Sequence, residues 1–538
     1  MISAKAPRSV VFLSMVSVVA FLQMVYQVTL PGPYYDEVYH SVYATWILTG
    51  KQLLWGPPFS YTLFGLPILG SLGYYTGPLE SYLVFLPLSL LGINILAIRA
   101  LPIFFAIVTL PFLFFFMRNR FGEASSYVTT MLFAFQPSLL LWSRVGLYPF
   151  SILVFFTCSS LYFFDRWLSG RNIRSLVVGF FLLGLGFETF ISFTWYIVAL
   201  GITVGIMRIN THVQRCHLPV VAVSFLAGVG PYLLPWLSGE NINFFIRYAQ
   251  TSYAGVNNLS YVENLFLRMQ HLRILIESSG FSFYGGVHSN PLATPLFIAS
   301  LVGTLPLIYF FKVRGRNAFN PHLFLLTVFT LMLLQTPITI SSLNSYQLLP
   351  LLPFTLMIVG SFFGWLWNAD KTLCKSLHIH KVGSVLKSCK ILVLLVLTFS
   401  ILLDLSTTAA YHTDLKETGG VGRWTNAMYD AADYVLSMNY TYVLAVDWGL
   451  SWGLLVASGG KLNVRDLFWA QGEDFKNTAN YYIDAGNVHF ISWRTPGSWS
   501  RLELLRETVT ARSESLVIER TFYQADGTPA IDLYTIVR

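Results

Sequence analysis

Residues 9–30 read SVVFLSMVSVVAFLQMVYQVTL, and PGPYYDEVYHSVYATWILTG follows at once over residues 31–50. About 20 consecutive apolar residues are enough for a helix to cross a bilayer. We expect a retained membrane anchor at 9–30 rather than a cleaved signal peptide, because the run is long for a signal core and no small-residue cleavage site follows it. The end of this first span therefore lies beside two adjacent acids, Asp36 and Glu37.

The composition of the whole chain is that of a polytopic membrane protein. Of its 538 residues, 54% are hydrophobic and only 11% are charged, whereas soluble proteins carry about 25% charged residues. The formal charge is +8, but the basic residues gather between the apolar runs, where they orient a chain in the bilayer. This distribution argues against nucleic acid as a partner, and the four cysteines indicate no disulfide framework.

The apolar runs predict a polytopic α-helical protein with about eleven transmembrane helices. We expect the spans at residues 9–30, 98–117, 124–142, 147–164, 175–189, 191–207, 217–237, 291–311, 321–338, 346–367 and 390–405. Residues 38–48 and 78–92 read as helices lying along the membrane surface, and 238–290 as a polar connection. A cytoplasmic N-terminus puts every short basic cluster inside. We therefore expect a multi-pass protein of the plasma membrane, with residues 31–97 and 406–538 outside.

Residues 406–538 differ from the membrane part in charge and in pattern. They carry 11 Lys/Arg against 15 Asp/Glu, whereas residues 1–405 carry 23 against 11. Helix-like and strand-like patterns alternate along this tail. We predict two domains: a transmembrane domain at 1–405 and an extracytoplasmic α/β domain at 406–538.

Asp36 and Glu37 are unusual because acids are rare in the membrane part, with only 11 before residue 406. A carboxylate at a membrane surface can take a proton from an alcohol, bind a metal ion or simply be solvated. Taken alone, the pair favours the solvated or helix-capping interpretation. The motifs that follow the pair change this balance.

Four short motifs follow the acid pair in a specific order. They are Thr76-Gly77-Pro78-Leu79, Ile98-Arg99-Ala100-Leu101-Pro102, Arg118-Asn119-Arg120-Phe121-Gly122 and Leu348-Leu349-Pro350-Leu351-Leu352-Pro353. With this order and topology, residues 10–405 resemble the GT-C class of integral-membrane glycosyltransferases. Within that class the chain is most similar to glycosyltransferase family 39, the protein O-mannosyltransferases, and to the lipid A aminoarabinose transferases.

The resemblance implies a GT-C fold and a glycosyltransferase that moves a hexosyl or pentosyl group from a polyprenyl phosphate. The acceptor is a hydroxyl of a protein, lipid or glycan at the outer face, and transfer inverts the anomeric centre. Residues 31–97 would form the catalytic loop, in which Asp36 matches the general base and Glu37 its neighbour. No cofactor is certain, although a divalent metal is compatible with this chemistry.

Further site residues follow from the same resemblance. Arg144, Tyr346 and Gln347 are candidates for binding the donor phosphate, against snorkelling or packing roles. Candidates for lining the cavity are Arg99, Glu188 and His40. The alternatives are an interfacial anchor for the arginine, a turn residue for the acid and a polar surface residue for the histidine.

Two positions depart from the pattern of the family. Relatives often carry Lys at the position of Thr76, and many carry Arg or His at the position of Tyr346. Both positions are suspected phosphate contacts, so the resemblance leaves open which residues replace these cations.

A transporter or exporter of a lipid-linked or small polar substrate is the main alternative class. Such a protein is expected to show inverted repeats and charges or helix breaks at mid-span, and the sequence shows none of these. It also lacks a phosphate loop, a dinucleotide fingerprint and a clustered Cys/His metal motif. Eleven spans, an acid-bearing first outer loop and a soluble outer tail fit an enzyme better than a transporter, and a structural or receptor protein would not need the acid pair.

Overall fold

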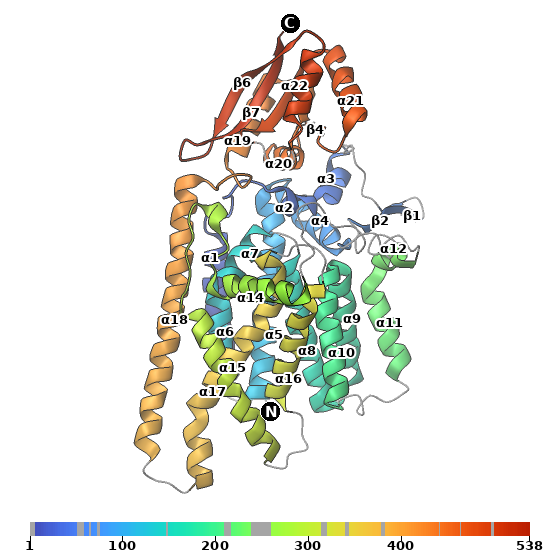
Figure 1. Cartoon of the computed structure of the whole chain (residues 1–538). Helices are drawn as coiled ribbons and strands as arrows, with labels where there is room; N and C mark the ends of the chain where they lie inside the picture. Colours follow the sequence, from blue (N-terminus) through green and yellow to red (C-terminus); the bar gives the residue numbers. More distant parts are fainter. Residues whose placement is uncertain are drawn as a thin grey trace.

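The chain forms a helical bundle with a sheet-containing domain over one end (Figure 1). The computed structural model describes residues 6–50, 59–63, 66–72, 76–146, 149–208, 217–237, 260–313, 320–338, 344–377, 382–440, 442–462, 464–495 and 500–537. Below, the end of the bundle under the C-terminal domain is called the junction end.

The bundle is built from apolar helices in chain order. They are α1 (Ala6–Val25), α5 (Ile95–Phe121), α6 (Glu123–Phe135), α7 (Pro137–Val145), α8 (Phe150–Gly170), α9 (Ile173–Thr189), α10 (Thr194–Ile206), α11 (Leu218–Val229), α15 (Ala293–Val313), α16 (Pro321–Gln335), α17 (Leu352–Leu377) and α18 (Val382–Thr418). Short 3-10 turns η1 (Ile191–Phe193), η6 (Thr336–Ile338) and η7 (Ser345–Leu351) adjoin α10, α16 and α17.

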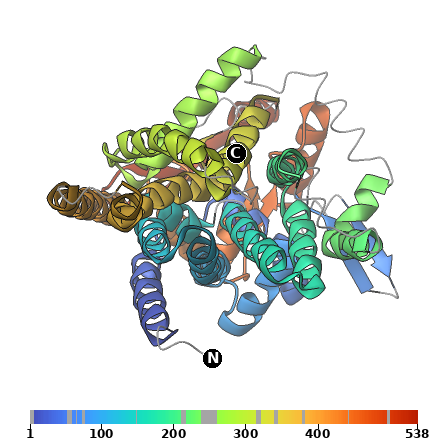
Figure 2. The ribbon, with the colours of Figure 1, turned by 90° about the horizontal axis from the view of Figure 1, so that it is seen from below.

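Within the described residues, five helices are long and apolar enough to cross a membrane. They cover Arg8–Val25, Ile95–Phe121, Pro321–Ile338, Ser345–Asn368 and Lys390–Thr418. The fourth lies inside the bundle, with 89% of its apolar window buried, whereas only 22% of the window of α1 is buried. From below, α1 stands at the rim (Figure 2). Its exposed apolar side chains therefore need lipid as their surroundings.

The predicted span at 124–142 is divided in the structure. Helix α6 ends at Phe135 and α7 begins at Pro137, and Gln136 between them has an extended backbone with φ −64° and ψ 114°. A residue that precedes proline is disfavoured in the α region because of the proline ring. The apolar pattern therefore predicted one helix where the backbone forms two.

The predicted span at 217–237 is also interrupted. Helix α11 ends at Val229, and Gly230 adopts a positive φ of 52°. A 3-10 turn η4 (Gly230–Tyr232) and a short helix α12 (Leu233–Leu237) complete the segment. Glycine takes a positive φ at little cost, and so it ends the helix here.

The stretch 238–290, expected as a polar connection, contains a helix. Helix α14 (Tyr261–Glu277) begins with a capping box, in which Ser260 and Glu263 bond each other's backbone N–H groups. This motif satisfies the free N–H groups of a helix start. Figure 1 shows α14 lying across the bundle rather than along it.

The loop between α1 and α5 contains short elements at the junction end (Figure 1). They are α2 (Tyr35–Tyr39), α3 (Val42–Thr49), the antiparallel pair β1 (Phe59–Leu63) and β2 (Leu66–Ser71), and α4 (Leu79–Leu91). The helices α3 and α4 correspond to the surface helices expected at 38–48 and 78–92, whereas the strand pair has no counterpart in the sequence prediction.

The C-terminal domain is a five-stranded mixed sheet with helices on both faces. Its elements are α19 (Ala427–Met438), β3 (Tyr442–Ala445), α20 (Leu450–Ala457), β4 (Val464–Asp466), α21 (Gly472–Ala485), β5 (Val488–Trp493), α22 (Leu502–Thr510), β6 (Ser515–Tyr523) and β7 (Pro529–Val537). The strand order is β4-β3-β5-β7-β6, with β3 parallel to β4 and β5 and the remaining pairs antiparallel. Every residue of β5 is buried, as expected for a central strand.

The C-terminal domain packs directly on the loop that carries the acid pair. Trp452 and Val456 of α20 belong to the same apolar cluster as the bundle. A Cβ placed on Gly32 would lie 2.0 Å from the carbonyl oxygen of Thr425. Only a residue without a side chain allows this approach, and so the two parts of the chain meet in contact.

Candidate active site

The two adjacent acids lie on the short helix α2, at the junction end. Both are in its first turn, where negative charge is favoured by the free N–H groups. Consecutive helical residues point about 100° apart, and the two side chains have different surroundings. Glu37 is 1% exposed, whereas Asp36 is only half-buried.

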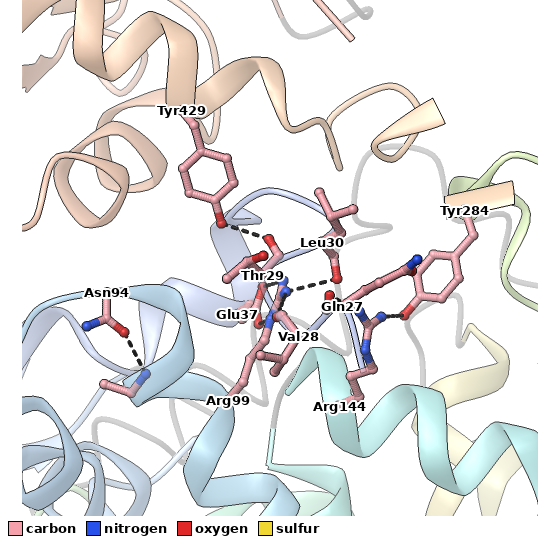
Figure 3. Close-up of polar contacts among 11 residues, drawn as sticks. Gln27, Val28, Thr29, Leu30, Glu37, Asn94, Arg99, Arg144, Tyr284 and Tyr429 are labelled. Atoms are coloured by element: carbon pink, nitrogen blue, oxygen red, sulfur yellow. Dashed lines mark hydrogen bonds and ion pairs between the residues drawn. The ribbon is translucent and has the colours of Figure 1, made fainter. Parts of the chain in front are cut away.

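Glu37 forms a double ion pair with Arg99 of α5 (Figure 3). Arg99 donates from Nε to Oε1 at 2.5 Å and from Nη2 to Oε2 at 2.8 Å. Its third nitrogen, Nη1, donates to the carbonyls of Val28 at 2.6 Å and Leu30 at 3.1 Å. Burial raises the pKa of Glu37, and the charge of Arg99 opposes that shift. The pair thus ties α2 to α5 and to the chain before it.

Arg144 of α7 holds the same segment from a second side (Figure 3). Its guanidinium donates to the hydroxyl of Tyr284 at 3.1 Å and to the carbonyl oxygen of Gln27, and the side chain is fully buried. From α19, the hydroxyl of Tyr429 donates to the carbonyl of Thr29 at 2.8 Å. Burial raises the pKa of Tyr429 to about 12, so it remains a donor at neutral pH.

The predicted phosphate contacts Tyr346 and Gln347 lie in η7. The ring of Tyr346 packs 5.1 Å from Trp142, centroid to centroid, and its hydroxyl accepts a hydrogen bond from Asn344 at 3.2 Å. Gln347 accepts from the backbone N–H of Asn344 at 3.0 Å, which makes it part of a capping box. Gln347 therefore has a structural partner, while Tyr346 lies close enough to Tyr34 to affect its pKa.

The predicted cavity residues His40 and Glu188 lie in separate groups. His40 Nδ1 lies 3.0 Å from Glu80 of α4, with both side chains buried. Glu188 lies near the end of α9 and is 3% exposed. A Cβ on Gly77 would lie 1.8 Å from its carbonyl oxygen. Glu188 therefore supports the Thr76-Gly77 part of the loop.

Aromatic residues from the C-terminal domain were missed by the sequence reasoning. Tyr34 stacks on Trp424 with ring centroids 3.8 Å apart, and Trp424 stacks on Phe283 at 4.3 Å. Tyr35 stacks on Trp452 at 4.7 Å. The only signal in the sequence was the run GGVGRWTN at 419–426, since glycines beside Arg and Trp mark an irregular segment.

In the described ranges, no three His, Cys, Asp or Glu side chains gather in the way a metal site requires. The centre of the junction instead contains Asp36, the buried pair Glu37–Arg99, and aromatic rings. This arrangement places a half-buried carboxylate, a group that can act as a general base, near a buried ion pair and stacked aromatic rings.

Comparison with known proteins finds a matching family model and similar folds. Residues 76–236 match the family model described as dolichyl-phosphate-mannose-protein mannosyltransferase. The fold is similar to ArnT from Cupriavidus metallidurans bound to undecaprenyl phosphate, with a TM-score of 0.60 and 13% identity, covering 99% of this chain and 98% of that one. It is also similar to the archaeal oligosaccharyltransferase AglB from Archaeoglobus fulgidus, with a TM-score of 0.50 and 14% identity, covering 91% and 70%. No curated protein matches the sequence.

The fold and the apolar helices define the class: this is an integral membrane protein with the GT-C fold of membrane glycosyltransferases. The resemblance predicted from the sequence is thus confirmed. Within the class, the chain has a fold similar to that of ArnT over almost its whole length. Together, the family match and the fold support a glycosyltransferase.

Proposed function

We propose that this protein transfers a hexosyl or pentosyl group from a polyprenyl phosphate to an acceptor hydroxyl, with inversion, at the extracytoplasmic face of the membrane. The solved ArnT structure contains undecaprenyl phosphate, and that of AglB contains dolichol phosphate and a peptide. These ligands support a lipid-linked donor for the present chain. The acceptor hydroxyl belongs to a protein, a lipid or a glycan.

The observation that carries the proposal is that the two adjacent acids differ in burial and in ion pairing. Glu37 is buried and its charge is balanced by Arg99, so it holds α2 in place. Asp36 is half-buried on the same helix, and this helix contacts α20 of the C-terminal domain. A half-buried acid on a helix that its neighbour holds in place is suited to act as a general base.

The reaction then needs one base and one leaving group. The acceptor oxygen attacks the anomeric carbon from the side opposite the phosphate, and Asp36 takes the hydroxyl proton. The bond from the anomeric carbon to the phosphate oxygen breaks, and the polyprenyl phosphate leaves as an anion. Because an alcohol is a weak nucleophile until its proton is removed, the base contributes about 10²–10⁴-fold to the rate.

The orientation proposed for the protein follows from its basic residues. The N-terminus is cytoplasmic, while the catalytic loop (31–97) and the C-terminal domain are extracytoplasmic, in a protein of the plasma membrane. A donor with a long hydrocarbon chain is dissolved in the bilayer, so an enzyme embedded there meets it at the junction end.

The test is the substitution Asp36→Asn, which keeps the shape of the side chain but cannot take a proton. Transfer from a polyprenyl-phosphate donor by the purified protein is expected to fall by about 10²–10⁴-fold. Asp430→Asn is the matched control, because Asp430 is an exposed acid in the first turn of α19. Turnover near that of the wild type in Asp36→Asn would reject the proposed base.

A further inference from the structure

A glycine-rich linker, residues 419–425, joins α18 to α19 and lies against the start of the catalytic loop. Gly420 has a φ of 97°, and a Cβ there would lie 2.5 Å from the side chain of Pro31. The backbone N–H of Val421 donates to the carbonyl of Phe283 at 2.8 Å. The linker is therefore fixed on both the loop and the bundle, rather than being a loose tether.

The side chains of the linker enclose the residues next to the acid pair. Trp424 stacks on Tyr34 with an interplanar angle of 6°, and Trp448 meets the same ring at 5.7 Å. The guanidinium carbon of Arg423 lies 5.3 Å from the centroid of Trp448. A cation over an indole face is held in place while its N–H groups stay available. Arg423 is thus linked through the rings of Trp448 and Tyr34 to the segment that carries the acid pair.

Among the arginines discussed at the junction, Arg423 differs from Arg99 and Arg144 in the partners of its charge. Arg99 is neutralised by Glu37, and Arg144 is fully buried against Tyr284 and a backbone carbonyl. In the part of the chain that the structure describes, Arg423 forms no ion pair, and it is half-exposed. Burial is the main cause that raises the pKa of Tyr34. Among the nearby charges, that of Asp36 raises this pKa further and that of Arg423 lowers it, so both charges lie near the same phenol.

We infer that Arg423 binds the phosphate of the lipid-linked donor and, after transfer, the phosphate of the departing polyprenyl phosphate. The inference rests on the proposed function. Guanidinium binds phosphate with two parallel hydrogen bonds, and a cation at this point stabilises the charge that develops on the leaving group.

The experiment measures lipid binding to the full-length protein in nanodiscs of neutral phosphatidylcholine. Undecaprenyl phosphate, undecaprenol and phosphatidylglycerol are titrated separately while the tryptophan fluorescence, to which Trp424 and Trp448 contribute, is recorded. For wild type, tight binding is expected only with undecaprenyl phosphate. Arg423→Gln should weaken that binding at least about 10-fold, the scale of one lost charge-assisted contact, and leave the undecaprenol signal unchanged.

The controls separate a missing charge from a damaged fold. Arg501→Gln removes a half-exposed arginine whose Cζ lies 5.6 Å from the ring of Phe468, and it should bind like the wild type. Arg423→Lys retains the charge and should recover part of the affinity. A lysine variant as weak as the glutamine variant would make the position structural and overturn the inference.

The remaining outcomes distinguish this inference from the proposed function. Arg423→Gln that binds undecaprenyl phosphate like the wild type overturns the inference, while transfer by the same preparation leaves the proposed function standing. Equal wild-type binding of phosphatidylglycerol would show a general anion site and reject the specific role. Asp36→Asn should still bind undecaprenyl phosphate normally, because it lacks only the base.

Discussion

The helix α5 carries Arg99 near one end and Arg118 and Arg120 near the other. Arg99 and Arg120 use similar chemistry for different purposes. At the junction end, Arg99 pairs with Glu37 and also bonds two backbone carbonyls in the irregular segment before α2. At the other end, Arg120 pairs with Asp165 of α8, which also accepts from Asn119 at 2.8 Å. At the Arg120 end, the charged side chains link two regular helices. At the other end, Arg99 also bonds backbone carbonyls that lie outside any helix.

The difference shows what fixes the candidate base. A helix satisfies its own backbone, so the pair at the Arg120 end only has to join two rigid bodies. The segment 27–30 lies outside the helices, so its carbonyl groups lack regular helical partners. Side chains of α5, α7 and α19 donate hydrogen bonds to these carbonyls instead. We therefore expect substitutions at the junction end to change the chemistry, and substitutions at the opposite end to change stability alone.

The largest effect is expected from Glu37→Gln, which leaves the guanidinium of Arg99 buried without a counter-charge. Both side chains are inaccessible to solvent, and breaking a buried ion pair costs about 3–5 kcal/mol of unfolding free energy. Transfer should be lost together with stability, because α2 loses its anchor. Thermal unfolding and transfer are measured on the same detergent preparation.

A double substitution tests whether charge is the cause. Glu37→Gln combined with Arg99→Gln removes both charges, so stability should recover relative to Glu37→Gln alone. Unfolding of the Glu37→Gln variant at the temperature of the wild type would contradict the role given to the pair.

A smaller effect is expected from Gly77→Ala, also at the junction end. The new Cβ would lie 1.8 Å from the carbonyl oxygen of Glu188, so the loop must move away from α9. Displacement of a site by about 1 Å costs up to about 10²-fold in rate, and we expect a loss of roughly 10-fold in kcat. Gly201→Ala in α10 is the control, since nothing lies within 4 Å of its Cβ. Equal loss in both variants would refute the argument.

At the opposite end, Asp165→Asn should lower stability without changing the chemistry. The carboxylate of Asp165 is buried and accepts from Arg120 and Asn119. Loss of a hydrogen bond to a charged group costs about 1.5–3 kcal/mol. Transfer per folded molecule should match the wild type, as judged by turnover normalised to the monodisperse fraction. A fall in turnover comparable to that of Glu37→Gln would remove the distinction between the two ends.

The sequence predicted features that depend on local pattern. The apolar run at 98–117 lies within α5, and its flanking Asn94 and Gly122 cap the helix as their types suggest. The break between α6 and α7 at Gln136–Pro137 follows the equally local rule that a residue before proline avoids the helical conformation. The prediction of one span at 124–142 gave more weight to the continuous apolar pattern than to this rule. Helices were therefore found more reliably than their interruptions.

The candidate site was predictable only in part, because its contacts join distant parts of the chain. Asp36 and Glu37 could be selected from their rarity and their motif. Nothing local indicated that Glu37 would pair with an arginine 62 positions later. The approach of Trp424 to Tyr34 joins the two ends of the membrane part, and it depends on how α18 and α1 pack.

The smallest effect is expected from Asp466→Asn, in the C-terminal domain and outside the ion pairs of α5. Asp466 ends β4, where its carboxylate accepts from the hydroxyl of Ser451 at 2.9 Å and from the N–H of Phe468 at 3.0 Å. Burial raises its pKa from 3.8 to about 6. The folded state therefore holds the proton more tightly than the unfolded chain does.

The sign of the pH dependence follows from that difference. Wild-type stability is highest below pH 3.8 with respect to this group and falls as the pH rises to about 6, by about 1.4 kcal/mol for each unit of pKa shift. An asparagine at this position does not titrate, so the unfolding temperature of Asp466→Asn relative to wild type should rise between pH 4 and pH 7, roughly across that window.

The control for this pH dependence is Asp474→Asn, at an exposed aspartate of α21, whose unfolding temperature should follow that of the wild type at both pH values. Transfer by Asp466→Asn at neutral pH should be unchanged, since Asp466 is no part of the junction. A stability difference that is the same at both pH values would mean that folding does not raise the pKa of Asp466. In that case the hydrogen bonds from Ser451 and Phe468, which favour the carboxylate, outweigh the burial that disfavours it.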